Sequence, residues 1–528
     1  MSIQCSLYCP VRLVLALVTC LMLASCDDST HDRRSVDAAD ISDASEVINS
    51  SEGSNASTLN TNDDIADISQ IVDRSPLDPD SAAGWPRARY ATAGRIPASA
   101  QRQGDARLGR QALLEQAYVS CGLPERVYRQ LLAERDVVGI DNRSPAAAGL
   151  PFDMNLVTDS NGVSVVTSNC LTCHGSTLFG ELVVGLGNEF LDFTNDASLL
   201  VERAGVLVRG EEETAAWELY ADRIAAISPY IRTHTVGVNP ANNLTFALIA
   251  HRDPTTNAWS TDPLLPLPPT DPPPVSVPPW WRMQKKTAMF NLGEARGDHA
   301  RIMMAASMLC TDTIEELQSI DAYAADIRTF IASLQPPQWP FELDRELAEK
   351  GRSLFEQTCS ACHGTYGSQG EYPARLVPVE TVGTDPVLLD FAHGAGAAYI
   401  DWFNQSYYGQ LSTAAPGAGY MAPPLDGVWA TAPFLHNGSV PTIRALLNSS
   451  IRPAYWQHVS RDSDNPDNYN KEDLGWHFIE LDSGKASTDK PIYVYDTDLP
   501  GYSNQGHLFG DTLTEQQRSA IIEYLKTL

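Results

Sequence analysis

Two short cysteine motifs constrain this chain more than any other feature. The pattern Cys-x-x-Cys-His occurs at residues 170–174 and again at 359–363, 189 residues later, and each copy is followed by glycine. This pattern attaches a c-type haem, because its two thiols bond to the porphyrin and its histidine binds the iron. A zinc site or a redox dithiol also pairs cysteines, but neither requires histidine directly after the second one. The sequence therefore predicts two covalently bound haem c groups, held by Cys170, Cys173, His174, Cys359, Cys362 and His363.

Residues 1–26 are predicted to be a lipoprotein signal peptide. Arg12 precedes an apolar run over residues 13–24, which is short for a membrane span and typical of an export signal. The run ends in Leu23-Ala24-Ser25-Cys26, which resembles the bacterial lipobox, whose cysteine becomes lipidated. An ordinary signal peptide cut near Ala24 is the alternative. We expect an exported chain, a periplasmic or outer-membrane lipoprotein that meets the membrane only through its lipid anchor.

Residues 27–83 are predicted to be a disordered acidic tether. Fourteen of them are Asp or Glu, against three arginines. The whole chain has a net charge of −29. Nucleic acids and anionic membrane surfaces attract basic patches, so this charge argues against both as partners.

The remaining chain shows traces of an internal repeat. Residues 327–334 and 521–528 share the i, i+3, i+4, i+7 apolar spacing of a helix, and each follows a haem motif by a similar distance. Helical patterns at residues 107–116 and 351–357 also resemble each other, and Thr514 is the expected cap of the last helix. Residues 336–340, rich in proline, mark a boundary. We predict a mainly α fold with two cytochrome c-like haem domains, 84–337 with a proline-rich insertion and 338–528, and extensive loops and insertions.

The proline-rich insertion leads to a pair of tryptophans. Nine prolines lie between Pro263 and Pro279, and Trp280 and Trp281 follow directly. Extended polyproline geometry can carry the two indoles to the first haem, where we expect them to take part in catalysis. The alternative is a surface strap whose tryptophans pack in an ordinary core.

Two cysteines remain outside the motifs and the signal. Cys121 and Cys310 can form a disulfide in an oxidising compartment. They can equally be two unrelated buried thiols, and the sequence gives no distance to decide between these alternatives.

The spacing of histidines bears on the first haem. No histidine occurs between His174 and His234. This gap predicts a first haem whose second axial position is open or holds water, the arrangement of an oxygenase or of a peroxidase that needs no ligand switch. The alternative is that His234, His251 or His299 folds back onto the iron.

Several segments together resemble the bacterial dihaem cytochrome c peroxidase superfamily. They are the two motifs, the phrase at residues 427–439 (Gly-Val-Trp-Ala-Thr-Ala-Pro-Phe-Leu-His-Asn-Gly-Ser) and the last helix. Within the superfamily, the prolines before Trp280, the Asn437 form of the phrase and the late Gly506-His507 look closest to the dihaem rubber oxygenases. The resemblance implies one haem that binds dioxygen and a second that transfers electrons.

The second axial ligand of the second haem is expected to be His507. Its glycine-flanked turn is similar to that of the late axial histidine in the rubber oxygenase branch, and glycine lets such a loop approach a porphyrin closely. His436 matches the peroxidase phrase, which implies a place between the haems and a catalytic role without iron binding. The other candidates for the iron are Met421, His393, His458 and His477.

These inferences predict a haem-dependent oxidoreductase that uses a small oxidant, dioxygen or peroxide, at the first haem. The second haem would relay electrons from an unknown organic or protein donor. A non-catalytic dihaem electron carrier is one alternative, and an oxidase of a partner protein is another.

The first testable expectation is the number of haems. Mass spectrometry of the denatured, exported protein should find two haems retained, because each motif forms its own thioether bonds. Replacing Cys170 and Cys173 together should remove one of them. Fewer than two haems in the unmodified chain would contradict the prediction.

Overall fold

The computed structural model describes residues 94–132 and 137–528. The predicted signal peptide and acidic tether, residues 1–26 and 27–83, lie outside these residues, and their predictions stay untested. Within the described ranges, no helix is both long enough and apolar enough to cross a membrane.

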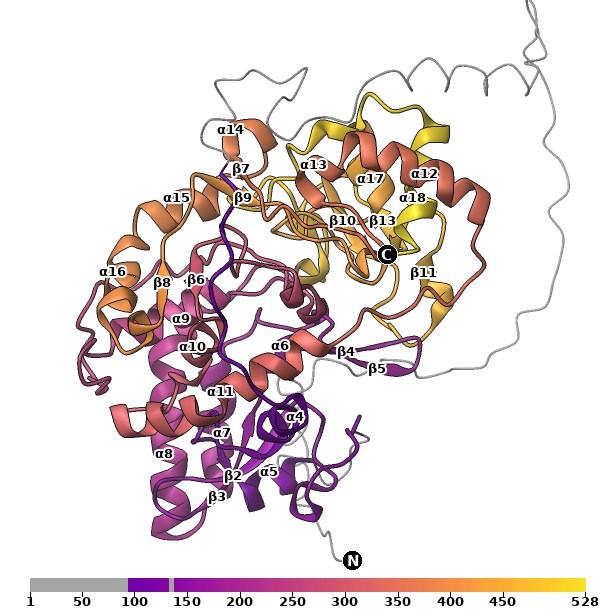
Figure 1. Ribbon diagram of the computed structural model, residues 1–528. Coiled ribbons are helices and arrows are strands. Elements are labelled where there is room, and N and C mark those ends of the chain that lie inside the picture. Colours follow the sequence, from indigo (N-terminus) through magenta and orange to yellow (C-terminus); the bar gives the residue numbers. More distant parts are fainter. Residues whose placement is uncertain (1–93, 133–136) are drawn as a thin grey trace, which may run out of the picture.

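Two helix pairs form the frame of the molecule (Figure 1). Helix α4 (Ala106–Glu115) packs on α11 (Ile314–Ser333), and α12 (Arg345–Thr358) packs on α18 (Glu515–Leu525). Thr313 and Thr514 begin α11 and α18 with matching capping boxes, so the expected cap of the last helix is confirmed. The four helices contain most of the stretches that the sequence repeat predicted, although α18 ends at Leu525 and leaves the last three residues of the expected helix outside it.

A glycine lies at the crossing point of each pair. A Cβ on Gly109 would lie 1.9 Å from the carbonyl oxygen of Asp326, and one on Gly351 would lie 1.8 Å from that of Ala520. Both distances are far inside van der Waals contact, so only glycine lets the backbones approach this closely. The two pairs therefore use the same packing device.

The prediction of a mainly α fold with two cytochrome c-like domains is wrong. The described residues contain six small antiparallel sheets, two of three strands and four of two. Their orders are β1-β3-β2, β13-β10-β14, β4-β5, β6-β8, β7-β9 and β11-β12. The longest of these strands, β2 and β3, have five residues each, and their sequences, Met-Asn-Leu-Val-Thr and Ser-Val-Val-Thr-Ser, lack the strict alternation that identifies a strand in a sequence.

The bounds of the strands are β1 Leu123–Pro124, β2 Met154–Thr158, β3 Ser164–Ser168, β4 Gly175–Leu178, β5 Glu181–Val184, β6 Ala295–Gly297, β7 Leu376–Pro378, β8 Ser412–Ala414, β9 Gly419–Met421, β10 Tyr455–His458, β11 Tyr469–Asn470, β12 Gly475–Trp476, β13 Phe478–Glu480 and β14 Tyr495–Asp496. The other α-helices are α5 Glu125–Leu132, α6 Leu171–His174, α7 Ala197–Ala204, α8 Gly210–Ile227, α9 Ala241–Ala250, α10 His299–Met303, α13 Ser360–His363, α14 Val379–Val382, α15 Val387–His393, α16 Ala397–Gln405 and α17 Ile443–Leu447. Short 3-10 turns include η4 Trp280–Gln284, η5 Met304–Ser307, η7 Val428–Ala430 and η12 Leu508–Gly510.

Segments from both sides of the predicted boundary at residue 337 are interleaved. Strand β6 pairs with β8, and Phe246 of α9 stacks on Tyr399 of α16 with ring centres 4.5 Å apart. Figure 1 shows α16 and β8, in orange, beside α9 and β6, in magenta. The residues that follow the second motif thus complete the part of the fold that carries the first.

A disulfide joins Cys121 to Cys310, with 5.8 Å between their Cα atoms. It ties the segment before β1 to the residues after η5. Of the two alternatives for these cysteines, the structure has the bonded one.

The glycine crossing gives a stability test. Gly351→Ala should lower the melting temperature, because the new Cβ meets backbone that cannot move aside, and overpacking of this kind costs about 1–3 kcal/mol. The gain in helix propensity, about 1 kcal/mol, should not offset it.

Gly139→Ala is the matched control, since a Cβ there would meet no atom within 4 Å. Thermal unfolding followed by circular dichroism measures both variants. Equal melting temperatures would show that the α12–α18 crossing can relax.

Candidate haem sites

Helices α12 and α13 present the second motif to a cavity of about 270 Å³. Asp344 caps the start of α12, and Cys359 joins its end to α13. Cys359, Cys362 and His363 all line the cavity. Neither thiol is in a disulfide, and burial raises the pKa of Cys359 to about 11. The site therefore offers two uncommitted thiols and an imidazole on one wall.

The His363 ring is oriented by a main-chain carbonyl. Its Nδ1 lies 2.8 Å from the carbonyl oxygen of Pro423, which can only accept, so Nδ1 carries the proton. Burial also lowers the pKa of His363, which favours the neutral ring. The lone pair is then on Nε2, the form of histidine that binds a metal.

His507 lies across the cavity from His363. The two ring centres are 6.2 Å apart. A metal–imidazole bond is about 2 Å long, and the ring centre lies about 1.1 Å beyond the nitrogen. Two imidazoles that bind one iron from opposite sides therefore have their centres about 6 Å apart, which agrees with the observed spacing. Burial, and then the neighbouring His363, lowers the pKa of His507 to about 3, so its ring is neutral as well.

A tight turn brings His507 to this position. His507 itself is left-handed, with φ of 50°, and a Cβ on the preceding Gly506 would lie 2.2 Å from the backbone of Gly383. The His507 amide donates to the carbonyl of Val382. The glycine-flanked approach predicted from the sequence is present.

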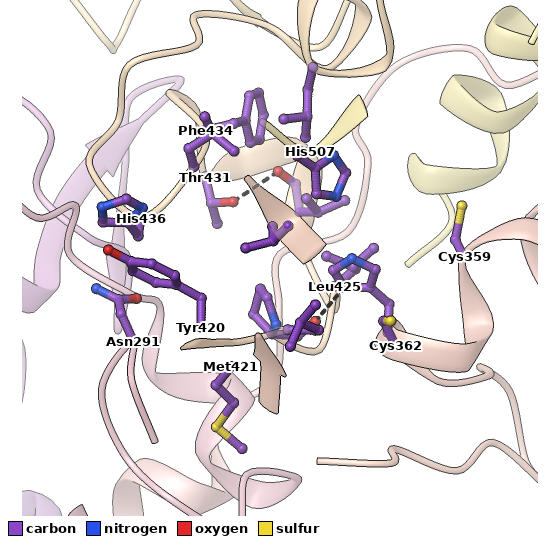
Figure 2. A pocket seen from close by; sticks show the side chains of 18 of the residues that line it. Asn291, Cys359, Cys362, Tyr420, Met421, Leu425, Thr431, Phe434, His436 and His507 are labelled. Carbon is purple, nitrogen blue, oxygen red and sulfur yellow. Dashed lines mark hydrogen bonds between the residues drawn. The ribbon is translucent and has the colours of Figure 1, made fainter. Parts of the chain in front are cut away.

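His436 occupies the other end of the cavity. Figure 2 shows it beside Tyr420 and Asn291, away from His507 and the two cysteines. Its ring centre is 4.3 Å from that of Tyr420, and burial lowers its pKa to about 3. The geometry brings His507, and not His436, to the His363 ring.

The remaining candidates for the second iron lie elsewhere. Met421 lines the cavity but packs with Ile96 and Leu376 in a separate apolar cluster. His393 bonds to the Gly417 carbonyl, and His477 is exposed. His458 contacts the rings of Phe190 and Trp456. None of these four side chains forms a ring contact with His363.

The first motif lies on the short helix α6. The amide of Asn188 donates to the carbonyl of Cys173, and the side-chain amide of Asn239 lies 3.4 Å from the Cys173 sulfur. Burial raises the pKa of Cys170 to about 12. As at the second motif, both thiols are free of disulfides.

His174 stacks on Trp280, with ring centres 4.9 Å apart and an angle of 23° between the rings. Burial lowers the pKa of His174 to about 4, and the backbone of Pro278 beside the ring opposes that shift. His363 likewise faces the carbonyl of Pro423. Each motif histidine thus lies beside the first residue of a Pro-Pro pair, Pro278-Pro279 or Pro423-Pro424.

No second imidazole contacts the ring of His174 in the described part of the chain. His234 is exposed and pairs with Asp271, while His251 stacks on Trp259. His299 is buried, with no hydrogen-bond partner at either ring nitrogen and no ring contact with His174. The structure therefore assembles an opposing histidine at the second motif and not at the first.

The turn η4 connects the two sites. Trp280 belongs to the apolar core around α4 and α11, whereas Trp281 belongs to the core around α12 and α18. The Trp281 Nε1 donates to the carbonyl of Asp426 over 2.8 Å, three residues after Pro423. Gly427, with φ of 62°, makes room for that indole. A packed path therefore runs from His174 through the two tryptophans to the loop that orients His363.

Sequence reasoning missed the Pro-Pro pairs and Asp426. Pro-Pro dipeptides are visible in the sequence, but they also occur at residues 268–269, 272–274 and 336–337, so the dipeptide alone does not single out the two beside the motif histidines. Asp426 gives no such signal, because its backbone oxygen rather than its side chain accepts the hydrogen bond.

The residues at both motifs fit haem c. Each has two free thiols beside a buried histidine, and the second also has an apolar cavity closed by His507. A bare metal ion fits less well, since the described residues contain no cluster of three or more His, Cys, Asp or Glu side chains that could hold one. The ligands that the zinc alternative requires are not assembled there.

Comparison with known proteins adds a family match. A family model described as RoxA-like, cytochrome c-like matches residues 419–457, which include Pro423, Asp426 and His436. This segment is similar to a RoxA-like cytochrome c. The match supports the rubber oxygenase-like branch of the expected resemblance. It does not confirm the wider peroxidase superfamily, and it contains neither cysteine motif.

Two curated relatives come from Sinorhizobium fredii (strain NBRC 101917 / NGR234). The chain is 31% identical to the uncharacterized protein y4iJ over 313 residues. This aligned region covers 45% of this chain and 50% of the relative. It is 28% identical over 207 residues to the uncharacterized protein y4iM, which covers 34% of this chain and 45% of the relative. The chain thus spans about half the length of the curated relatives it matches.

The opposed histidines give a spectroscopic prediction. In His507→Ala, cyanide or imidazole should bind at the second haem, because one axial position would open, while the spectrum of the first haem should not change. Absorption and electron paramagnetic resonance spectra measure this.

His477→Ala, at an exposed position, is the control and should behave as the unmodified protein. If His436→Ala opens the second haem instead, or if the unmodified protein shows the near-infrared band of methionine ligation, then the assignment of His507 is wrong.

Proposed function

We propose that this chain is an exported dihaem c-type oxidoreductase that activates dioxygen or peroxide at the first motif and receives electrons through the second. When bound, such haems supply iron that carries electrons and, where one axial position is open, binds dioxygen or peroxide. The match to a RoxA-like cytochrome c supports a haem cytochrome. The choice between oxygenase and peroxidase is left to experiment.

One observation carries the proposal, the difference between the two motif histidines. His363 faces His507 at 6.2 Å, a spacing that suits two axial ligands and hence electron transfer. His174 has Trp280 as its ring neighbour and no opposing histidine among the described residues. Its side of the molecule is therefore the better candidate for binding a small oxidant.

The Trp280–Trp281 pair supports the proposal that the first motif binds the oxidant and the second transfers electrons. The two indoles pack in different cores and lie on the path between the motif histidines. Trp280 also restricts the orientation of the His174 ring through stacking. We assign Trp280 a positioning role at the first site, and Trp281 the role of a packed bridge for electrons.

Export is proposed on chemical grounds as well as on the predicted signal. Disulfides persist in oxidising compartments, and the Cys121–Cys310 bond fits that setting. The electron donor, whether an organic molecule or a protein, is expected to be neutral or cationic, since the chain carries a net charge of −29.

The decisive experiment compares the two haems directly. Electron paramagnetic resonance should show one low-spin haem and one that is high-spin or binds cyanide, because among the described residues a histidine faces the second motif and not the first. Oxygen consumption with polyisoprene or another alkene, set against peroxide turnover with a reduced cytochrome, then separates oxygenase from peroxidase. Two low-spin haems that ignore cyanide and peroxide would support the electron carrier and overturn the proposal.

A second test concerns the bridge. Trp281 is fully buried, so Trp281→Ala would cost about 3–5 kcal/mol of stability, and Trp281→Phe is the better variant. We expect Trp281→Phe to slow electron transfer between the haems by roughly tenfold, about 1.4 kcal/mol in the barrier, because the hydrogen bond to Asp426 is lost.

Trp456→Phe is the matched control. Trp456 is also buried and donates to a backbone carbonyl, that of Ser439, but it lies in a different cluster. Stopped-flow reduction measures both variants. Equal rates of electron transfer in Trp281→Phe and in the control would show that Trp281 only packs in the core and does not bridge the haems.

A further inference from the structure

Three cationic side chains line the cavity of the second motif. They are Arg282, Lys286 and Arg375, here called the cavity cations. Arg282 is 7% exposed and Arg375 is 5% exposed. Burying a charge is costly unless an opposite charge or good hydrogen bonds compensate for it. Two of them, Arg282 and Lys286, therefore point to an anion that belongs in this largely apolar cavity, even though the chain as a whole is strongly acidic.

Arg282 has neutral hydrogen-bond partners in the structure. Its Nε donates to the carbonyl of Asp426 over 3.1 Å, and a terminal nitrogen lies 3.3 Å from the Thr431 hydroxyl. The Asp426 carboxylate forms a salt bridge with Lys285, whose Nζ lies 2.7 Å from Oδ1. Within the described ranges, no carboxylate lies within ion-pair distance of Arg282. Its position is thus fixed while its charge lacks a close partner.

The ionisation of the neighbouring groups agrees with a missing anion. Burial lowers the pKa of Arg282 to about 10 and that of Lys286 to about 8. Glu294 is the acid that interacts with Lys286, but burial raises its own pKa to about 7, so it supplies only part of a negative charge at neutral pH. The protein alone leaves this end of the cavity short of negative charge.

We propose that the cavity cations bind the propionate carboxylates of the second haem, and that Arg282 raises the reduction potential of that haem. The inference rests on the proposed function, which places a haem at Cys359 and Cys362. The propionates are the acidic groups of a porphyrin, and a planar guanidinium matches a carboxylate with two parallel hydrogen bonds. A fixed positive charge near an iron favours its ferrous form, because reduction removes one positive charge from the iron.

The position of Arg282 gives this contact a further consequence. Arg282 Nε and Trp281 Nε1 donate to the same oxygen, that of Asp426. The residue that would bind a propionate is therefore locked to the residue that bridges the two sites. The second haem would therefore be held at a fixed distance from Trp281. Trp280, the preceding residue of η4, stacks on His174, so the same turn would also fix the second haem relative to the first motif.

The experiment compares Arg282→Gln with Arg282→Lys in the full haem-loaded protein. Spectroelectrochemical titration should find a lower midpoint potential for the second haem in Arg282→Gln, because the compensating charge is gone, and most of the potential restored in Arg282→Lys. The propionate bending band in the resonance Raman spectrum should shift in Arg282→Gln. A purely structural role for Arg282 would not move that band.

A double variant, Lys285→Gln with Asp426→Asn, is the matched control. It removes a neighbouring cation together with its own carboxylate, so the net charge near the cavity is unchanged. The potential of the second haem should then stay close to that of the unmodified protein. An equal fall in this control and in Arg282→Gln would overturn the inference, since it would reflect general disturbance of the loop.

An unchanged potential and an unchanged propionate band in Arg282→Gln would also overturn it. If Arg282→Gln does not fold, Lys286→Met replaces it, with the same expected fall and the same contradicting result. Failure of the proposed function is seen separately, in the unmodified protein, as fewer than two haems by mass or as the absence of a low-spin second haem.

Discussion

The carbonyl oxygen of Asp426 accepts hydrogen bonds from Trp281 and from Arg282, and the relation between the two motifs depends on this contact. It fixes η4 against the loop that begins at Pro423, the residue whose carbonyl orients His363. Because Trp280 packs in the first core and the adjacent Trp281 packs in the second, η4 joins the surroundings of the two motif histidines.

The two helix pairs supply the rigid frame that makes this possible. Gly109 and Gly351 allow each pair to approach at backbone contact, and capping boxes begin both closing helices. The frame is therefore nearly the same twice, while the loops around it differ. At the second motif, a turn at Gly506 delivers His507, whereas at the first the proline-rich strap delivers Trp280. This difference in loops, on a repeated frame, places a histidine opposite His363 and an indole against His174.

The sequence was a good guide wherever a signal is local. The helical spacing of residues 107–116 and 521–528, the cap at Thr514 and the glycine-flanked turn at His507 all depend on neighbours in the chain, and the structure has each of them. The expected fold class failed because strands such as β6 and β8 have only three residues, and their partners lie more than a hundred residues away. Trp281 shows the same limit, since the sequence left open whether its indole reaches the first haem or packs in a core, and the structure buries it in the core around α12 and α18.

By itself, the sequence determined the chemistry that the motifs can support: two pairs of thiols, each followed by histidine, and a late histidine between glycines. Those features rest on residue type and on spacing within one turn of chain. Only the tertiary structure decided that His507 rather than His436 lies opposite His363, that Cys121 meets Cys310, and that Arg282 lines the cavity of the second motif. These outcomes depend on contacts between segments that are distant in the chain. Two of the features that decide such contacts, burial and hydrogen bonds accepted by backbone carbonyls, leave almost no trace in the order of the residues.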